Sequence, residues 1–397
     1  MMALQPQNIL VWHGTSRTGV KGSIVTAEID GFPQWPNAAP NDGYDAKTLA
    51  DAVSFAEAHE TVWPRDMYID GIFVGSAHVN DKPPYNQPMG PVVSRGGANG
   101  LVLRGGKLLA EWGNTRQNDM TFSIAKSYLA VLTGIAVSQG LIGSIDERVG
   151  DRVKDGGFEG PHNSQITWRH LLEQTSEWHG ELFERPDSVD WNRYAGADAS
   201  TGNDKKGTER TLGTPGTHFE YNDVRVNRLS LSLLRLFKEP LPEVLDRHIM
   251  TPLGCSPTWK WNGYETSWVD VDGKRIQSVP GGGHWGGGLV ISARDQARLG
   301  ELILNRGHWQ GQQLLPESWV DAMLTSSKAQ PTYGLLWWLN PGKALYPSAS
   351  ESSVFALGGG SNIIWIDHEK DLVVVIRWVE KAFADELIGR IARAITD

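Results

Sequence analysis

The segment at residues 121–140 reads TFSIAKSYLAVLTGIAVSQG, and apolar residues recur in it at spacings of three and four from Ile124 to Val137. That period is typical of an α-helix with a wide apolar face, and Gly140 stands where such a helix commonly ends. The sequence therefore predicts a long, buried helix that begins close to Ser123.

The first turn of this predicted helix carries a serine and a lysine three residues apart. Ser123 and Lys126 would project from the same face, where a lysine whose charge is disfavoured by burial can accept the serine proton. The helix N-terminus also offers N–H groups to a developing oxyanion. A single Ser-x-x-Lys spacing is weak evidence, since a chain of this length contains about one by chance. An N-cap serine followed by a solvated lysine explains this segment equally well.

Length and composition narrow the class of protein. The 397 residues suffice for one large folded unit. Acidic residues outnumber basic ones, 46 to 37, without long runs of either sign, which argues against nucleic acid and membrane surfaces as partners. The single cysteine, Cys255, excludes an internal disulfide. Residues 1–8 lack a signal-peptide pattern and no segment approaches the ~20 apolar residues of a membrane span, so we expect a cytoplasmic protein.

Helical and strand patterns can be assigned along most of the chain. The predicted helices after the first 44 residues, which we interpret as an irregular arm, span residues 45–59, 167–174, 223–238, 241–249, 293–305, 316–324 and 383–395. The predicted strands span 101–104 and 107–112, joined by two glycines, and later 333–339, 361–366 and 372–379. The loop at 195–216 is either a surface excursion or a mobile lid.

Strand patterns thus occur at both ends of the chain, and such remote strands commonly pair into one sheet. We predict an α+β fold: an antiparallel sheet built from N- and C-terminal strands, flanked by helices, with an inserted, mainly helical lobe. In this interpretation residues 1–140 hold the arm and the first part of the α/β region, residues 141–285 the helical lobe, and residues 286–397 the rest of the α/β region.

A tyrosine lies between a Gly/Pro turn and the helix predicted at 223–238. Tyr221 would point out of the helical lobe. A phenol beside a lysine ammonium has its phenolate favoured and can serve as a base or a proton relay. On this segment alone, a buried structural tyrosine is the simpler interpretation.

Three glycines, Gly358 to Gly360, follow an apolar run near the C-terminus. Glycine lets another backbone approach closely and leaves main-chain N–H groups accessible. One such N–H, together with that of Ser123, would form an oxyanion hole. A bulged strand start explains the glycines equally well.

Taken together, the order and spacing of these segments resemble the serine β-lactamase and penicillin-binding-protein superfamily. The closest branch is the class C-like one that includes esterases and 6-aminohexanoate-dimer hydrolases. The resemblance covers roughly residues 100–397. It is supported by LLEQTS at 171–176, similar to the family's Leu-Leu-x-x-Thr-Ser, and by GGLVISARD at 287–295, similar to its Gly-Gly-Leu segment before a helix.

The resemblance implies a β-lactamase/transpeptidase-like fold and a role for each matching residue. Ser123 would be the acylated nucleophile and Lys126 its base. Tyr221 matches the tyrosine that passes protons to the leaving group and to the deacylating water. Gly359 matches the strand residue whose N–H completes the oxyanion hole with that of Ser123.

Two departures from the family pattern affect these expectations. Relatives often have Tyr-x-Asn, whereas this chain has Asp223 two residues after Tyr221, and an ionised carboxylate there would weaken Lys126 as a base. β-Lactamases carry Lys-Thr-Gly on the late strand, whereas residues 356–358 read ALG. Without that cation we expect poor binding of β-lactams and D-Ala-D-Ala peptides, and a preference for esters or amides that need no carboxylate anchor.

Further pocket residues follow from the same segments. His284 and Trp285 precede the Gly-Gly-Leu segment and could face the cleft, although a histidine among glycines is more often a plain loop residue. Glu177 and Trp178 replace the Gly-Leu that often follows Thr-Ser, which predicts a polar and aromatic wall. The histidines show no metal-ligand spacing, and no phosphate-binding loop is present.

The sequence therefore predicts a serine hydrolase that cleaves a small ester or amide through an acyl-enzyme, with no metal or organic cofactor. The alternatives are a β-lactamase or D,D-peptidase of the same fold, and a penicillin-binding sensor that is acylated once and stays blocked.

Overall fold

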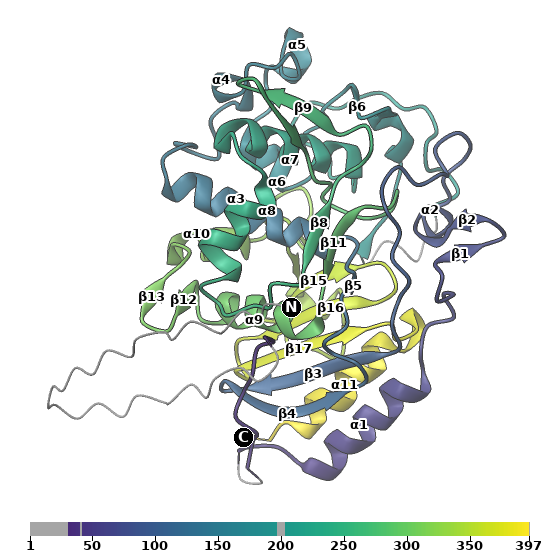
Figure 1. Cartoon of the computed structure of the whole chain (residues 1–397), viewed down its shortest axis with the longest axis vertical. Helices are drawn as coiled ribbons and strands as arrows, with labels where there is room; N and C mark the ends of the chain where they lie inside the picture. The colour runs from purple at the N-terminus through teal and green to yellow at the C-terminus, as the bar shows by residue number, and fades with distance from the viewer. Residues whose placement is uncertain (1–30, 40–41, 197–202, 397) are drawn as a thin grey trace, which may run out of the picture.

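A computed structural model describes residues 31–39, 42–196 and 203–396 of the chain. Its centre is a six-stranded antiparallel sheet with the strand order β14-β15-β16-β17-β3-β4 (Figure 1). The strands are β3 (Asn99–Arg104), β4 (Lys107–Trp112), β14 (Trp338–Leu339), β15 (Val354–Gly358), β16 (Asn362–Asp367) and β17 (Leu372–Arg377). The N-terminal hairpin therefore pairs with the C-terminal strands, which confirms the predicted α+β arrangement.

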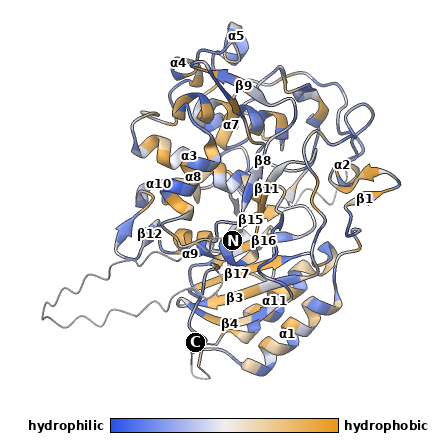
Figure 2. Cartoon of the chain, in the orientation of Figure 1, coloured by the Kyte–Doolittle hydropathy of each residue, from blue (hydrophilic) through white to orange (hydrophobic). Residues whose placement is uncertain are grey.

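The junction of the two halves of the sheet is the pairing of β17 with β3. Val374 lies opposite Val102 and Val375 lies opposite Leu101. All six residues of β17 are buried, because helices cover both faces of the sheet. Helices α1 (Ala46–Ala58) and α11 (Ala384–Ala394) pack against each other over one face, and α9 (Ala293–Leu304) crosses the other (Figure 1). Figure 2 shows the apolar colour on these strands and mixed colour on α1 and α11.

A mainly helical lobe lies beyond the β14 edge of the sheet. Helix α3 (Ile124–Ser138) connects the two parts because it packs against β15 and β16 as well as α7 (Asp223–Phe237). The remaining helices of the described chain are α2 (Val74–His78), α4 (Val149–Arg152), α5 (Gly160–Asn163), α6 (Trp168–Leu172), α8 (Leu241–Leu245), which continues as a π-helical turn to Met250, and α10 (Glu317–Met323). No helix of this described part is long and apolar enough to cross a membrane.

Smaller strands surround this framework. A three-stranded sheet of β5 (Asp119–Met120), β11 (Gly288–Ile291) and β8 (Lys260–Asn262) holds the segment that leads into α3. Two-stranded pairs are formed by β1 (Tyr68–Ile69) with β2 (Ile72–Phe73), β6 (Glu181–Leu182) with β7 (Arg185–Pro186), β9 (Trp268–Val271) with β10 (Lys274–Gln277), and β12 (His308–Trp309) with β13 (Gln312–Gln313).

The structure confirms most predicted elements and corrects one strand. Residues 333–339 form a strand only at their end, because Leu336 has a left-handed φ of 59° and its N–H bonds to Leu172 O instead of a neighbouring strand. The apolar side chains of this segment are buried although its backbone is folded into a turn. The sequence pattern of such a buried turn cannot be told from that of a buried strand.

Two irregular regions were also predicted. Most of the arm before residue 44 and residues 197–202 of the predicted loop lie outside the described residues. Residues 203–216 are not a plain surface excursion, since Lys206 is buried and Arg210 is ion-paired to Glu177 and Glu220.

Candidate active site

Ser123 occupies the N-cap position of α3, one residue before the first helical residue. The preceding residue, Phe122, has a φ of 51°, a conformation that is costly for a bulky side chain. Its ring is held by Trp63 and Phe73, at centroid distances of 5.6 and 6.3 Å. The N–H of Thr121 bonds to Leu289 O of β11 at 2.9 Å. Strand pairing and aromatic packing therefore stabilise the sharp turn that presents Ser123.

The Lys126 ammonium lies directly behind the serine hydroxyl. Lys126 Nζ is 2.9 Å from Ser123 Oγ, and the lysine side chain is only 1% exposed. The predicted one-turn spacing therefore brings the hydroxyl and the amine into contact. A lysine this deeply buried requires a counter-charge, because an isolated buried ammonium is costly.

Asp223, the first residue of α7, supplies this counter-charge. Its Oδ1 accepts a hydrogen bond from Lys126, and its Oδ2 accepts one of 2.8 Å from Arg193 Nη1. Burial alone would raise the pKa of Asp223, but the charges of Lys126 and Arg193 and the hydrogen bond from His284 outweigh it and hold the pKa well below its ordinary value. Asp223 is therefore an ionised carboxylate that joins two cations at the base of the site.

A second group of buried charges surrounds Asp223. His284 lies between two carboxylates, with Nδ1 2.5 Å from Asp223 Oδ2 and Nε2 3.1 Å from Asp81 Oδ2. Burial acts to lower the pKa of His284, but the charges of Asp81 and Asp190 and the hydrogen bonds to the carboxylates raise it overall. The Lys206 ammonium pairs with Asp81 and lies 3.1 Å from Asp190 Oδ1.

Part of this group has the spacing of a metal site. Asp81, Asp190 and His284 each place one ligand atom within 4.8 Å of the other two. The sequence does not reveal this grouping, because the three residues come from separate segments. Lys206 already contacts both carboxylates, so the chain itself supplies a cation at this position.

The aromatic ring of Tyr221 lies next to Lys126 and Arg193. The ring centroid is 4.7 Å from Lys126 Nζ and 5.2 Å from Arg193 Cζ, and both are cation–π distances. The ring also packs on Trp338 at 5.7 Å. Asn222, which caps α7 by accepting from Arg225 N, fixes the backbone between Tyr221 and Asp223. The cap explains how one short segment presents both a phenol and a carboxylate to Lys126.

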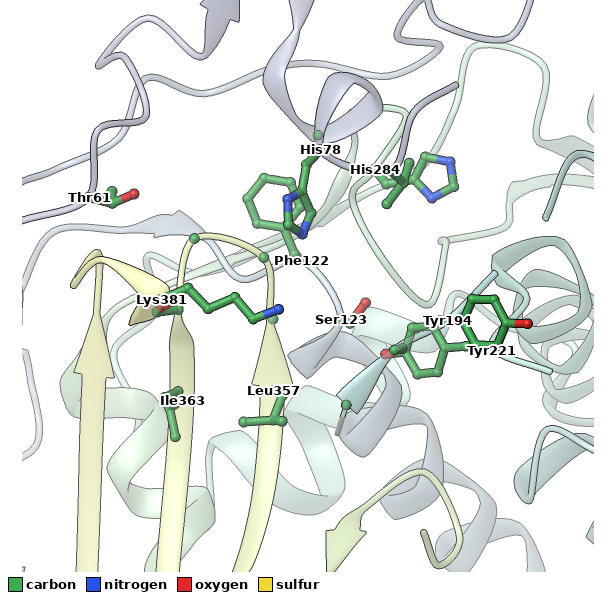
Figure 3. Close-up of a pocket in the computed structure, with 18 of the residues that line it drawn as sticks. Thr61, His78, Phe122, Ser123, Tyr194, Tyr221, His284, Leu357, Ile363 and Lys381 are labelled. Atoms are coloured by element: carbon green, nitrogen blue, oxygen red, sulfur yellow. The ribbon is translucent and has the colours of Figure 1, made fainter. Parts of the chain in front are cut away.

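A cavity of about 620 Å³ opens in front of Ser123. Ser123, Tyr221, Arg193 and His284 line it, as do the three glycines from 358 to 360, which lie where β15 turns into β16. Figure 3 shows Ser123 with Tyr194 and Tyr221 on one side and Lys381 on the other. The structure thus brings the predicted serine, tyrosine and glycines to one cavity.

Three predicted pocket residues, Glu177, Trp178 and Trp285, do not line the cavity, and the polar and aromatic wall predicted from Glu177 and Trp178 is wrong. Glu177 is fully buried and ion-paired to Arg210 and Arg225, two arginines that also pair with Glu220 in the helical lobe. Trp178 is buried beside it and donates its indole N–H to Gly157 O at 2.7 Å. Trp285 packs on His284, with ring centroids 3.6 Å apart, and bonds to Asp81, so it supports the histidine from behind.

Other cavity residues were not predicted from the sequence. Arg193 and Trp63 belong to loops, Lys381 to a 3₁₀ turn and His78 to the five-residue helix α2. These segments carry no periodic pattern and match no motif. The one available signal is the charge of Arg193 and Lys381, which does not distinguish them from the other basic residues of the chain.

Comparisons with known proteins agree with this architecture. The family described as β-lactamase matches residues 92–390. A 6-aminohexanoate-dimer hydrolase from Paenarthrobacter ureafaciens is 22% identical over 303 residues, which are 69% of this chain and 70% of that protein.

Solved structures show the same fold. One from Bacillus anthracis, provisionally assigned as a 6-aminohexanoate-dimer hydrolase, has a TM-score of 0.55 at 16% identity and covers 91% of this chain and 88% of its own. A β-lactamase/D-alanine carboxypeptidase from Pseudomonas syringae has a TM-score of 0.53 at 17% identity. The match covers 77% of this chain and 93% of that protein. The match to the family described as β-lactamase spans well over half of the residues of this chain. The chain therefore belongs to the β-lactamase family.

Proposed function

We propose that this β-lactamase-fold hydrolase cleaves a carboxylic ester or amide through an acyl-enzyme on Ser123. The observation that carries the proposal is the 2.9 Å contact between Ser123 Oγ and Lys126 Nζ at the floor of the cavity. A nucleophile in contact with a buried amine, which a third group orients in turn, is the arrangement that activates a hydroxyl. Asp223 is that third group.

In the reactive form, Lys126 has lost a proton to solvent by way of Tyr221. In the first half of the reaction, Ser123 Oγ then attacks the carbonyl carbon and its proton passes to the neutral amine of Lys126. The negative oxygen of the tetrahedral intermediate accepts hydrogen bonds from the N–H groups of Ser123 and Gly359. The carbon–leaving-group bond then breaks, and the leaving group takes a proton by way of Tyr221. Water hydrolyses the acyl group from Ser123 by the same proton route in reverse.

Asp223 has two opposed effects in this scheme. It stabilises the cation that forms when Lys126 takes up a proton, as the carboxylate does in a Ser-His-Asp triad. It also makes that proton harder to remove before the next turnover. We propose that Tyr221, whose ring contacts Lys126, shares the proton for this reason.

The test is hydrolysis of a p-nitrophenyl ester by Ser123→Ala and Lys126→Ala variants. We expect Ser123→Ala to abolish turnover and acyl-enzyme formation in mass spectrometry, with an unchanged melting temperature. Lys126→Ala should be nearly as damaging, and a mild effect would move the base role to Tyr221. Turnover by Ser123→Ala would refute the proposal. Rapid hydrolysis of a chromogenic cephalosporin would instead favour a β-lactamase, and a single stoichiometric acylation would favour a sensor.

A further inference from the structure

The cavity has a cation on the side away from Tyr221. Lys381 begins the short 3₁₀ turn Lys381–Phe383 after the last strand of the sheet, and its exposed side chain lines the cavity. Figure 3 shows this side chain extended along the strand ends, with its amino group turned toward the side where Ser123 lies. Leu357 and Ile363 line the cavity next to it.

Lys381 has no ion-pair partner among the described residues, although two carboxylates are near it in sequence. Glu380 Oε2 instead accepts hydrogen bonds of 3.2 Å from Thr61 Oγ1 and from Val62 N. Asp385 accepts bonds of 3.0 and 2.9 Å from the N–H and hydroxyl of Ser348. Both acids also line the cavity, and hydrogen bonds from Thr61, Val62 and Ser348 engage their carboxylate oxygens in place of Lys381. The Lys381 ammonium is therefore paired with neither acid and can contact a group that enters the cavity.

The positive charge of Lys381 contributes to a lowered pKa of His78, which lines the same cavity. His78 itself is an exposed residue. Desolvation by the protein atoms around the ring, followed by the charges of Arg193, Lys381 and His284, lowers the pKa of His78 to about 4, although the charge of Glu380 acts in the opposite direction. At neutral pH His78 is thus an uncharged residue of the cavity that Lys381 and Glu380 also line.

We propose that Lys381 binds a carboxylate on the acyl portion of the substrate. The inference rests on the proposed function, in which the leaving group departs toward Tyr221. Since Lys381 lies on the other side of Ser123, the part of the substrate that reaches it is the part that stays on the serine. The partly exposed side chain of Leu357 offers that part an apolar contact, so the favoured acyl group is an aliphatic chain that ends in a carboxylate.

This assignment changes one expectation from the sequence. Residues 356–358 lack the Lys-Thr-Gly cation, from which we expected no need for a carboxylate anchor. The structure supplies a cation to the cavity from a different element, beyond the end of β17. Because it lies on the acyl side, it would select a different class of anionic substrate.

The test compares three chromogenic esters. These are p-nitrophenyl hexanoate, the mono-p-nitrophenyl ester of adipic acid, and the hexanoate ester of 3-carboxy-4-nitrophenol, which carries the anion on the leaving group. We expect the wild-type protein to prefer the adipate ester over the neutral one in kcat/KM. Lys381→Met should reduce this preference about tenfold, the usual value of one charge-assisted contact. Lys381→Glu should reverse it and favour the p-nitrophenyl ester of 6-aminohexanoic acid.

The control is Lys328→Met, which removes an exposed lysine outside the cavity and should leave the preference unchanged. Melting temperatures show whether each variant is folded. A preference for the anionic leaving group, or an adipate preference that survives Lys381→Met, would overturn the inference while the esterase activity stands. A wild-type protein that hydrolyses none of the esters would overturn the proposed function as well.

Discussion

Asp223 forms a buried ion pair with Lys126, the side chain that contacts the hydroxyl of Ser123. The carboxylate is 3% exposed and the lysine 1%, so solvent does not screen their attraction. Asp223 also contacts Arg193 and His284, and His284 in turn contacts Asp81. In the proposed mechanism, the charge of Asp223 therefore acts on the amine that takes the proton of Ser123.

Replacing Asp223 with Asn should strongly reduce activity. The amide retains an oxygen that can accept a hydrogen bond but removes the charge that compensates Lys126 and Arg193 in the buried site. We expect kcat/KM for a p-nitrophenyl ester to fall about tenfold or more, the usual value of one charge-assisted contact. Asp155→Asn, which removes a carboxylate paired with Arg228 on the helical lobe, is the matched control. An unchanged kcat/KM in Asp223→Asn would show that this carboxylate does not support the reaction.

Replacing Tyr221 with Phe should slow both acylation and deacylation. The ring and its contacts with Lys126 and Arg193 remain, so only the phenolic hydroxyl is tested. We expect kcat to fall about 100-fold or more, the usual contribution of a positioned proton donor. Tyr194→Phe provides a comparison, since Tyr194 lines the same cavity and is 43% exposed. Equal effects of the two substitutions in stopped-flow kinetics would remove Tyr221 from the proton route.

The two glycines at the end of β15 should differ in their tolerance of alanine. A Cβ on Gly358 would lie 2.0 Å from the backbone oxygen of Thr121, two residues before the nucleophile, so the turn or the strand must move. On Gly359 it would lie 3.1 Å from the ring of Trp63 and 3.3 Å from that of Phe122, which are side chains that can adjust.

We therefore expect Gly358→Ala to lose most activity and about 1–3 kcal/mol of unfolding free energy. The Gly359→Ala variant keeps the backbone N–H of residue 359. It should therefore retain most of the activity and most of the unfolding free energy. Ester hydrolysis and urea unfolding measure these effects. The opposite order would mean that Gly358 does not position the oxyanion hole.

Glu177 should make stability depend on pH in the acid range. Burial acts to raise the pKa of Glu177, but hydrogen bonds and charges from Arg210 and Arg225 lower it from 4.5 to about 2. The unfolded chain therefore binds a proton between these pH values that the folded chain does not. The stabilisation is complete above pH 4.5 and is lost as pH falls toward 2.

Urea unfolding of the wild type and of Glu177→Gln from pH 7 to pH 3 tests this dependence. We expect a difference of about 2–3 kcal/mol at pH 7 that shrinks steadily below pH 4.5. Glu209→Gln, at an exposed position, should show no such trend. A difference that stays constant with pH would mean that the glutamate acts by shape and not by charge.

Local pattern was enough to predict the framework of the site. The apolar period of residues 124–137 predicted α3, and with it the one-turn separation that puts Ser123 Oγ and Lys126 Nζ in contact. The two-residue turn at Gly105-Gly106 predicted the β3–β4 hairpin, and the two apolar runs after residue 361 predicted β16 and β17. In each case the relevant residues are neighbours in the chain, so backbone geometry alone relates them.

The surroundings of Ser123 could not be predicted in this way. Asp81, Arg193 and His284 come from three separate segments. Arg193 and His284 contact Asp223, and Asp81 contacts His284, because of how the loops pack over the helical lobe. Glu177 was expected at the cavity but is drawn into the lobe by two arginines, because a buried charge must be paired. Lys381 reaches the cavity only because β17 ends at the edge where Ser123 lies. Short-range spacing thus specifies the contact between Ser123 and Lys126, whereas long-range packing and the pairing of buried charges select the groups that surround these two residues.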